Sequence, residues 1–385
     1  MLFRWNQGLK GRAISYYTVA VAQAPAFQMS DFSTDFQPTN LVTGRLLEQL
    51  RRHPKRVVFT EGEDLRILQA AATLVKHQAV APILLGDRDR IRSLAATHGV
   101  SLSFIHIIDP PKATDFALFC RRMENMARYR TLQVANPAEL VARPHYFGAL
   151  MVQYGQADAI VSGNQSLPAA YFRALIQTIK PLPHVAKIFA ASLILGSHLK
   201  NLGGDGILFL ADCGLIPNPT VEDLAAIALE TGKLARHFLG RTPHVAMLSH
   251  STKGSAATPD AKRMAAAAAL AREQIRTGFL EIEIDGELQA DVALDPEAAE
   301  VKLPDATTRP TADVLIFPNL DAAHIALKLL QHVAGAQTYG RIILGLSRPA
   351  AHIPRTASVQ SILGTTAAVA AEAIKFHLLY PDSDF

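Results

Sequence analysis

The sequence predicts an α/β fold of two three-layer α/β/α domains with mainly parallel sheets. Short, almost continuous apolar runs alternate with segments of helical periodicity, which is the pattern of parallel strands covered on both faces by helices. The chain has 385 residues, of which 49% are hydrophobic, enough for a substantial core. At about 100–200 residues per domain, this length favours two domains over one.

The alternation begins near residue 40. A helix at 40–53 leads into a strand at 56–60, followed by a helix at 61–77, a strand at 81–86, a helix at 87–99 and a strand at 103–109. A strand at 157–163 and a helix at 169–179 come next. Further apolar runs predict strands at 206–212, 244–248, 280–285, 312–317 and 341–346, each followed by a polar turn and a helical pattern.

Polar residues that directly follow the predicted strands are the candidates for binding. In a parallel sheet, ligands bind beyond the carboxyl ends of the strands, where helix N-termini present free N–H groups. The segments there are Glu61–Asp64, Ser162–Asn164, Asp212–Gly214, Ser249–Ser255, Asp285–Glu287, Pro318–Asn319 and Ser347–Pro349. From them we predict Ser162, Asn319 and Arg348 as substrate-binding residues.

The segment HSTKGSA, residues 250–256, is the richest of these. Ser251, Thr252 and Ser255 can cap a helix or offer hydroxyls to an anion, Gly254 lets backbone N–H groups approach it, and Lys253 adds charge. Helix capping alone needs one of these hydroxyls, so both interpretations stay open.

Charge and composition narrow the class of protein. The net charge is +4 and the basic residues are spread along the chain, which favours a small anionic substrate over nucleic acid. Cys120 and Cys213 are far apart and form no CxxC pair, which argues against a disulfide framework or a cysteine zinc site and suits a reducing, cytoplasmic setting. No apolar run approaches the roughly 18 residues needed to cross a bilayer. Residues 1–39 are expected to be an extension, a non-native leader or a segment resembling a targeting peptide.

Seven stretches resemble the phosphate acetyltransferase family, in that family's order and over about residues 55–375. They are FTEGEDLRILQAAA, YFGALMVQYGQADAIVSGN, LFLADCGLIPNPTVEDLAAIA, MLSHSTKGSA, IDGELQADVAL, VLIFPNLDAAHIALKLLQ and ILGLSRP. The same fold is shared with phosphate butyryltransferase and with the acyltransferase-like C-terminal part of some malic enzymes. The chain lacks a G-x-G-x-x-G strand–helix unit and is too short to include a malic-enzyme portion.

The resemblance implies reversible acetyl transfer between acetyl-CoA and orthophosphate, giving acetyl phosphate and CoA, with no metal and no bound cofactor. It also implies a homodimer and a site in the cleft between the domains. Domain I would be discontinuous, formed by residues 40–185 and 345–385, with residues 186–344 as domain II. In this setting we predict that Ser251, Lys253 and Ser255 bind the phosphates of CoA.

Arginines of the family match this sequence unevenly. The arginine ten positions after the glycine of VSG is present as Arg173, and the resemblance assigns it to phosphate binding. A second family arginine, before the YFG motif, corresponds to Arg128 or Arg130 across a gap in the alignment. Arg355 keeps the arginine of the C-terminal motif.

That C-terminal motif departs from the family at its other reactive positions. Pro354 stands at the serine position and Ser361 at the position of the aspartate base, while His352 replaces the motif's first aspartate. Proline has no N–H to donate, and serine is no base at neutral pH without help. Histidine titrates near 6.5, so we predict His352 as the base, with nearby arginines holding its pKa down. Two alternatives stay open: a non-catalytic acyl-CoA-binding or regulatory protein, and a phosphate acyltransferase for a longer acyl chain.

Overall fold

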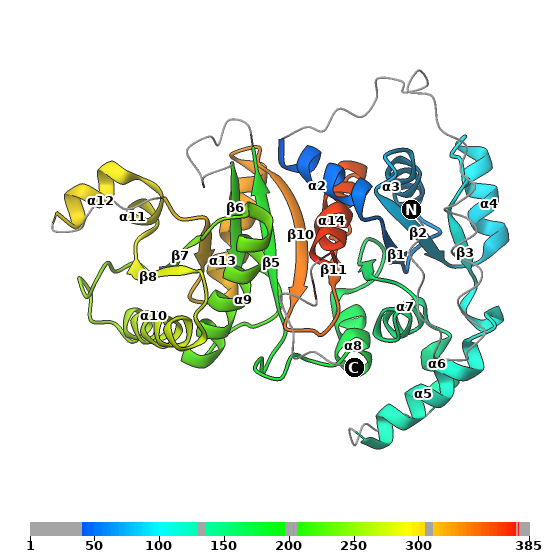
Figure 1. Cartoon of the computed structure of the whole chain (residues 1–385), viewed down its shortest axis with the longest axis horizontal. Coiled ribbons are helices and arrows are strands. Elements are labelled where there is room, and N and C mark those ends of the chain that lie inside the picture. The colour runs from blue at the N-terminus through cyan, green and yellow to red at the C-terminus, as the bar shows by residue number, and fades with distance from the viewer. Residues whose placement is uncertain are drawn as a thin grey trace, which may run out of the picture. The chain divides into compact units, whose positions relative to one another are not determined.

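The computed structural model describes residues 41–129, 136–196, 203, 206–304, 311–374 and 376 (Figure 1). The segment 1–39 and Arg130 lie outside this described part. The described residues form alternating strands and helices, which confirms the α/β class, while the division into two domains stays a prediction.

The first elements run from α2 to β4. They are α2 (Leu41–Arg52), β1 (Lys55–Phe59), α3 (Leu65–Lys76), β2 (Val80–Leu85), α4 (Arg88–Thr97), β3 (His106–Ile108), the 3-10 helix η2 (Pro110–Lys112), α5 (Phe116–Tyr129), α6 (Pro137–Val141), α7 (Pro144–Gln153) and β4 (Ala159–Ser162). Asp64 and Asp87 begin α3 and α4, because each carboxylate accepts backbone hydrogen bonds from the first turn of its helix.

The remaining elements run from α8 to α14. They are α8 (Pro168–Thr178), β5 (Phe189–Leu195), β6 (Ile207–Ala211), α9 (Val221–Leu239), β7 (His244–Leu248), α10 (Pro259–Gly278), β8 (Glu283–Leu288), α11 (Ala290–Leu294), α12 (Pro296–Lys302), β9 (Val314–Ile316), α13 (Leu320–His332), β10 (Gln337–Leu344), β11 (Ala350–His352) and α14 (Val359–Glu372). Strand β8 begins three residues later than predicted, and β3 covers only the middle of the predicted strand at 103–109.

All the strands of the described residues belong to one sheet with the order β3-β2-β1-β4-β11-β10-β5-β6-β9-β7-β8. Seven of the ten neighbouring pairs in this described sheet are parallel, as predicted. The pairs β11–β10, β10–β5 and β5–β6 are antiparallel. The central strand β10 therefore runs against its two neighbours, which the alternating pattern did not predict.

The C-terminal segment returns to the first strands of the chain. Strand β11 pairs in parallel with β4, and α14 contacts α2, α3, β1 and β4. The hydroxyls of Thr43 in α2 and Tyr339 in β10 are 2.7 Å apart and hydrogen-bonded. The hydrogen-bonded sheet continues from β10 into β5, so the strand pairing does not separate the two predicted domains, and their boundaries stay a prediction.

Helices α7 and α8 cover one face of the strands around β4. Val58, Ile160 and Ala350 from β1, β4 and β11 share a buried cluster with Phe147 of α7 and Leu175 of α8. Successive side chains of a strand point to opposite faces. Helix α14, which contacts the same strands but is absent from this cluster, therefore lies on the other face.

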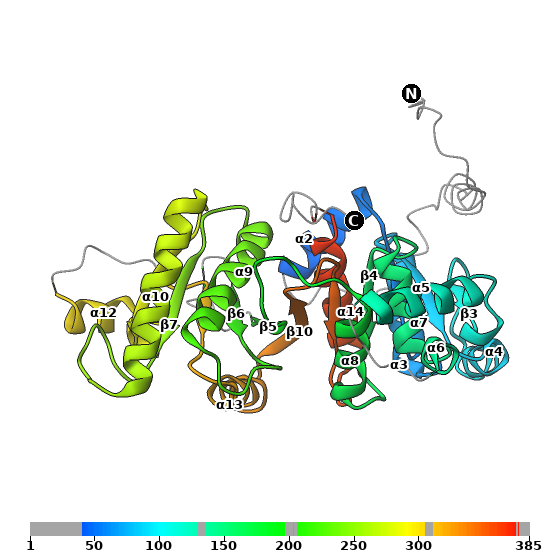
Figure 2. The same cartoon turned by 90° about the horizontal axis from the view of Figure 1, so that it is seen from below.

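The second group of strands, β6 to β9, is also covered on both faces. Leu208 and Leu210 of β6 share a cluster with Leu327 of α13. Phe209, between them, meets Phe238 of α9 with ring centroids 5.9 Å apart. Helices α9 and α10 lie side by side (Figure 2).

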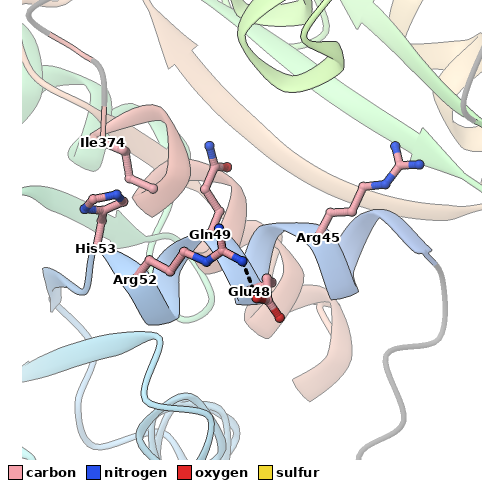
Figure 3. Close-up of a pocket in the computed structure, with 6 residues that line it drawn as sticks. All are labelled: Arg45, Glu48, Gln49, Arg52, His53 and Ile374. Carbon is pink, nitrogen blue, oxygen red and sulfur yellow. Dashed lines mark hydrogen bonds and ion pairs between the residues drawn. The ribbon is translucent and has the colours of Figure 1, made fainter.

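Among the described residues, none of the helices is both long enough and apolar enough to cross a membrane. A pocket of about 370 Å³ opens beside α2 and is lined by Arg45, Glu48, Gln49, Arg52, His53 and Ile374 (Figure 3). An ion pair of 2.8 Å between Arg52 and Glu48 lies along it. Since α2 leads into the amino end of β1, this pocket is at the opposite end of that strand from Thr60.

Candidate active site

A row of polar residues crosses five neighbouring strands on the sheet face that α7 and α8 cover. We call Thr60, Ser162, His352, Arg341 and Ser192 the polar row. Thr60 follows β1, Ser162 and His352 end β4 and β11, Arg341 lies in β10 and Ser192 in β5. All except Arg341 are no more than 3% exposed. Polar side chains buried in a sheet need hydrogen-bond partners or a ligand.

The strand register aligns this row. Ser162 pairs with His352, and Ile342 pairs with Ala351, so Arg341 comes opposite His352 on the antiparallel neighbour. Ser192 belongs to the same face as Ala190, which joins the α7–α8 cluster.

His352 is the most enclosed member of the row. It is 2% exposed, and its ring stacks on Tyr171 and packs against Phe172, with centroids 6.2 and 5.2 Å away. Neither ring nitrogen has a hydrogen-bond partner among the described residues. Burial, Arg341 and His145 lower the pKa of His352 to about 3. The predicted direction of the shift is confirmed, but burial is its main cause, and Arg341 is the arginine that contributes.

His145 is a second histidine at this edge, and no spacing in the sequence relates it to the other members of the row. It lies in the first turn of α7, with Nδ1 3.0 Å from the hydroxyl of Thr60 and 3.2 Å from that of Ser162. Thr60 also donates a 2.6 Å hydrogen bond to Ser162. Burial lowers the pKa of His145, and Glu61 acts in the opposite direction. The hydroxyl of Ser162, predicted to bind substrate, is thus held by its neighbours.

Arg341 is the charged member of the row. Within the described part of the chain, its guanidinium makes no hydrogen bond and no ion pair of 4.0 Å or less. Burial lowers the pKa of Arg341, while Cys213 and Asp212 act in the opposite direction. Arginine nevertheless stays charged at neutral pH.

Glu61 organises the loop that follows β4. Its two carboxylate oxygens accept hydrogen bonds from the backbone N–H groups of residues 163–166, at 2.8–3.2 Å, and from the Ser166 hydroxyl at 2.6 Å. These amides lie just before α8 and would otherwise be free to bind an anion. The carboxylate of Glu61 already occupies them.

Two more carboxylates bind loop amides at other strand ends. Asp212, after β6, accepts from the N–H groups of Ala190 and of residues 214–216. Glu287, near the end of β8, accepts from Gly254 N–H at 2.7 Å and from the Ser251 hydroxyl at 2.9 Å. Three successive antiparallel pairs separate β11 from β6, so the carboxyl ends of β6 and β8 lie at the opposite edge of the sheet from Ser162 and His352. Beside Ser162 and His352, where Glu61 already binds the loop amides, an anion would be bound mainly by side chains.

The segment 250–256 is held together by its own contacts. Ser251 is buried, the Ser255 hydroxyl accepts from Thr252 N–H, and Lys253 forms an ion pair with Asp285. Thr258 caps α10, so the expectation that a hydroxyl of 251–255 caps this helix is wrong. The contacts favour support of the Glu287 loop over CoA binding by Ser251, Lys253 and Ser255.

Asn319 and Arg348 are placed by the topology. Asn319 caps α13, accepting a 2.9 Å hydrogen bond from Ala322 N–H. Arg348 follows β10, whose reversed direction puts it at the amino end of β4. Burial lowers the pKa of Arg348 there, and Asp158 acts in the opposite direction. This position argues against Arg348 as part of the substrate site, because the prediction assumed that β10 runs parallel to its neighbours.

Arg173 and Arg355 are both exposed. Arg173 lies in α8, on the helix that carries Tyr171 and Phe172 to His352, and Arg355 follows β11. Neither side chain makes a hydrogen bond or ion pair with other described residues. The backbone carbonyl of Arg355 accepts a 2.8 Å hydrogen bond from Arg66, which fixes this loop beside α3. Arg128 belongs to α5, but its side chain lies outside the described residues.

Pro354 and Ser361 have structural roles. The Pro354 carbonyl accepts a 2.9 Å hydrogen bond from Ala357 N–H. The Ser361 hydroxyl donates a 3.0 Å hydrogen bond to the carbonyl of Thr338 and so joins α14 to β10. Ser361 is therefore not placed as a base. Among the described residues, no cluster of three or more His, Cys, Asp or Glu side chains could hold a metal ion.

A mixed α/β sheet carries a buried, neutral histidine, and the helix and strands next to this histidine carry unpaired arginines. This arrangement defines an enzyme-like α/β protein suited to a small anion. Residues 41–371 match the family described as phosphate acetyl/butaryl transferase, so the chain belongs to that family. A phosphate acetyltransferase of Thermoanaerobacterium thermosaccharolyticum is 35% identical over 328 residues, which are 85% of this chain and 98% of that protein.

Two solved structures have the same fold. A phosphotransacetylase from Staphylococcus aureus matches with a TM-score of 0.76 and 33% identity, over 86% of this chain and 99% of that one. A phosphotransacetylase from Streptococcus pyogenes matches with a TM-score of 0.78 and 30% identity, over 87% of this chain and 98% of that one.

Proposed function

We propose that the protein is a phosphate acetyltransferase, which transfers an acetyl group reversibly between acetyl-CoA and orthophosphate. The observation that carries this proposal is the pair of exposed, unpaired arginines, Arg173 and Arg355, on the elements that flank His352. Membership in the family and the named activity of relatives that share nearly their whole length with this chain support it.

Arg173 and Arg355 bind the phosphoryl group in this proposal. A guanidinium offers planar, paired N–H donors that match phosphate oxygens. Both side chains are free to turn toward a ligand, since neither is engaged by another described residue. Arg128 is proposed as a further contact.

The acyl transfer requires loss of the CoA thiol proton. The thiolate sulfur attacks the carbonyl carbon of acetyl phosphate, a C–S bond forms, and the C–O bond to the phosphoryl group breaks. His352 accepts the thiol proton and returns it to the departing phosphate. The imidazole is neutral before substrate binds, because its pKa is about 3. A phosphoryl anion beside it raises this pKa, so the histidine becomes a better proton acceptor when acetyl phosphate is in place.

The proposed substrate, partners, compartment and oligomeric state are taken from the resemblance to the family. Coenzyme A takes part as a substrate, no nucleic acid or membrane is involved, and the protein is a cytoplasmic homodimer. The acetyl group is proposed over longer acyl groups because the relatives at 32–35% identity are named for acetate.

The test is an assay of purified protein with acetyl phosphate, CoA and orthophosphate. We expect CoA-dependent loss of acetyl phosphate that arsenate stimulates, and slower reaction with butyryl phosphate. Faster turnover of butyryl phosphate would replace the acetyl assignment with the longer-chain one. No turnover of either, together with CoA binding in calorimetry, would favour the non-catalytic acyl-CoA-binding alternative.

A further inference from the structure

We infer that Arg341, together with His352 and Ser192, forms an oxyanion subsite that holds the phosphoryl group of acetyl phosphate or orthophosphate. The inference rests on the proposed function and adds residues that the strand-end motifs do not include. We call these three residues the Arg341 subsite.

The first argument is the unpaired charge of Arg341. Its side chain is partly buried, yet the described residues provide no hydrogen bond or ion pair to the guanidinium. Removing a charge from water without a partner costs free energy, and proteins retain such groups where a ligand supplies the partner. Gly214 lies against the Arg341 side chain, and a Cβ there would come within 2.9 Å of Arg341 Cδ. The fold thus leaves room for this arginine.

The second argument is the balance of charge around Arg341. Lys328 and His324 of α13 lie close enough for Arg341 to lower their pKa values, although burial is the larger cause for both. Burial raises the pKa of Cys213 to about 12, so this thiol is neutral. Asp212 is the nearby carboxylate, but four backbone N–H groups already bind it. The surroundings of Arg341 therefore remain positive and favour an anion.

The third argument is a pair of buried hydrogen-bonding groups beside it. His352 is 2% exposed and Ser192 is 1% exposed. The two imidazole nitrogens have no hydrogen-bond partner among the described residues. The Ser192 hydroxyl meets the Cys213 thiol, a weak hydrogen-bond acceptor, and no stronger partner among the described residues. A neutral imidazole and a hydroxyl each have one proton to donate. An oxyanion between Arg341 and these groups would satisfy both donors.

The burial of the Arg341 subsite limits the size of the ligand that it can bind. The loop amides after β4 are bound by Glu61 and those after β6 by Asp212, so side chains must provide the donors. Because Ser192 and His352 are almost fully buried, only a small group, such as an oxyanion or the thiol end of CoA, reaches them. The phosphoryl group fits this requirement, and the phosphates of CoA, which carry a bulky nucleotide, do not.

The test measures orthophosphate binding by calorimetry and the KM values for acetyl phosphate and CoA, with Arg341→Gln, Arg341→Lys and Ser192→Ala. Arg276→Gln is the control, since Arg276 is exposed on α10 and paired with Glu273. We expect Arg341→Gln to weaken orthophosphate binding and raise the KM for acetyl phosphate by about tenfold or more, with the KM for CoA unchanged. Arg341→Lys should lose less, and Ser192→Ala should weaken binding by a few-fold.

The melting temperature separates a binding role from a structural one. Replacing an unpaired, partly buried charge should leave the melting temperature of Arg341→Gln unchanged or higher. An unchanged orthophosphate Kd in both Arg341→Gln and Ser192→Ala would overturn the subsite, as would a rise confined to the KM for CoA. If the wild-type protein binds orthophosphate through Arg341 but transfers no acetyl group, the subsite stands and the proposed function fails.

Discussion

Tyr171 stacks on His352 with their rings inclined by 28°, and its hydroxyl donates a 3.2 Å hydrogen bond to the carbonyl of Ala351. The tyrosine comes from α8 and the histidine from β11, residues that are 181 positions apart in the chain. This packing fixes the imidazole at the end of β11 and removes it from water. The strong lowering of the His352 pKa follows mainly from that burial.

Replacing His352 tests whether it accepts the thiol proton. We expect His352→Gln to lower turnover at pH 7 by about 100-fold or more, the contribution typical of a general base. Above the thiol pKa of about 8.5, CoA is ionised without help, so the difference from wild type should narrow. Turnover between pH 6 and 9 is the measurement, with His98→Gln on the surface as control. A deficit of the same size at every pH would exclude His352 as the base.

Arg173 and Arg355 are predicted to bind one phosphoryl group. Each alanine variant should raise the KM for acetyl phosphate about 10- to 100-fold, since a charge-assisted hydrogen bond contributes roughly 1.5–3 kcal/mol. If both contact the same phosphoryl group, their effects should not add in the double variant. Steady-state kinetics of wild type, the two single variants and the double variant give a double-mutant cycle, which measures the coupling between the two arginines. Strictly additive effects would show that they act on separate groups.

Much of the fold follows from the sequence because apolar periodicity depends on local structure. The run at 341–346 predicts a strand, but a buried strand has the same pattern whichever way it runs. The direction of β10 depends on its pairing with β5 and β11, which are distant in sequence. This is why the sequence pattern places Arg348 at the wrong edge of the sheet.

The candidate site was predicted only in part, for a related reason. His352 could be predicted because it lies inside the C-terminal motif of the family. Arg341 was missed because it lies within strand β10, whereas the prediction considered only residues that follow a strand. The one sign of Arg341 in the sequence was a charged residue at the start of the apolar run RIILGL. The role of Glu61 depends on a loop 102 residues away at Gly163, and no local pattern shows that contact.

Glu61 is predicted to position the loop before α8. Glutamine keeps one carbonyl oxygen in place of two carboxylate oxygens, so Glu61→Gln should lose at least two of the hydrogen bonds to residues 163–166. We expect a loss of about 1–3 kcal/mol in the free energy of unfolding and faster amide exchange in this loop. Denaturant unfolding and hydrogen exchange are the measurements, with exposed Glu48→Gln as control. Unchanged exchange at 163–166 would contradict this role.

Glu372, at the end of α14, is predicted to make the stability of the protein depend on pH. Burial raises the pKa of this carboxyl to about 8 in the folded chain, against 4.5 for the free group. Unfolding therefore releases its proton between these values. The stability is complete below about pH 4.5 and is lost as the pH rises toward 8, at about 1.4 kcal/mol per pH unit.

Glu372→Gln removes this titration while keeping the shape of the protonated side chain. We expect the variant to match wild type near pH 4.5 and to melt at a progressively higher temperature than wild type as the pH rises to 8. Calorimetric melting curves at pH 5, 6, 7 and 8 give the measurement, and Glu300→Gln, exposed on α12, is the control. If the two melting temperatures differ by the same amount at every pH, the carboxyl is ionised in the folded protein, and a partner for its charge must then be present beside α14.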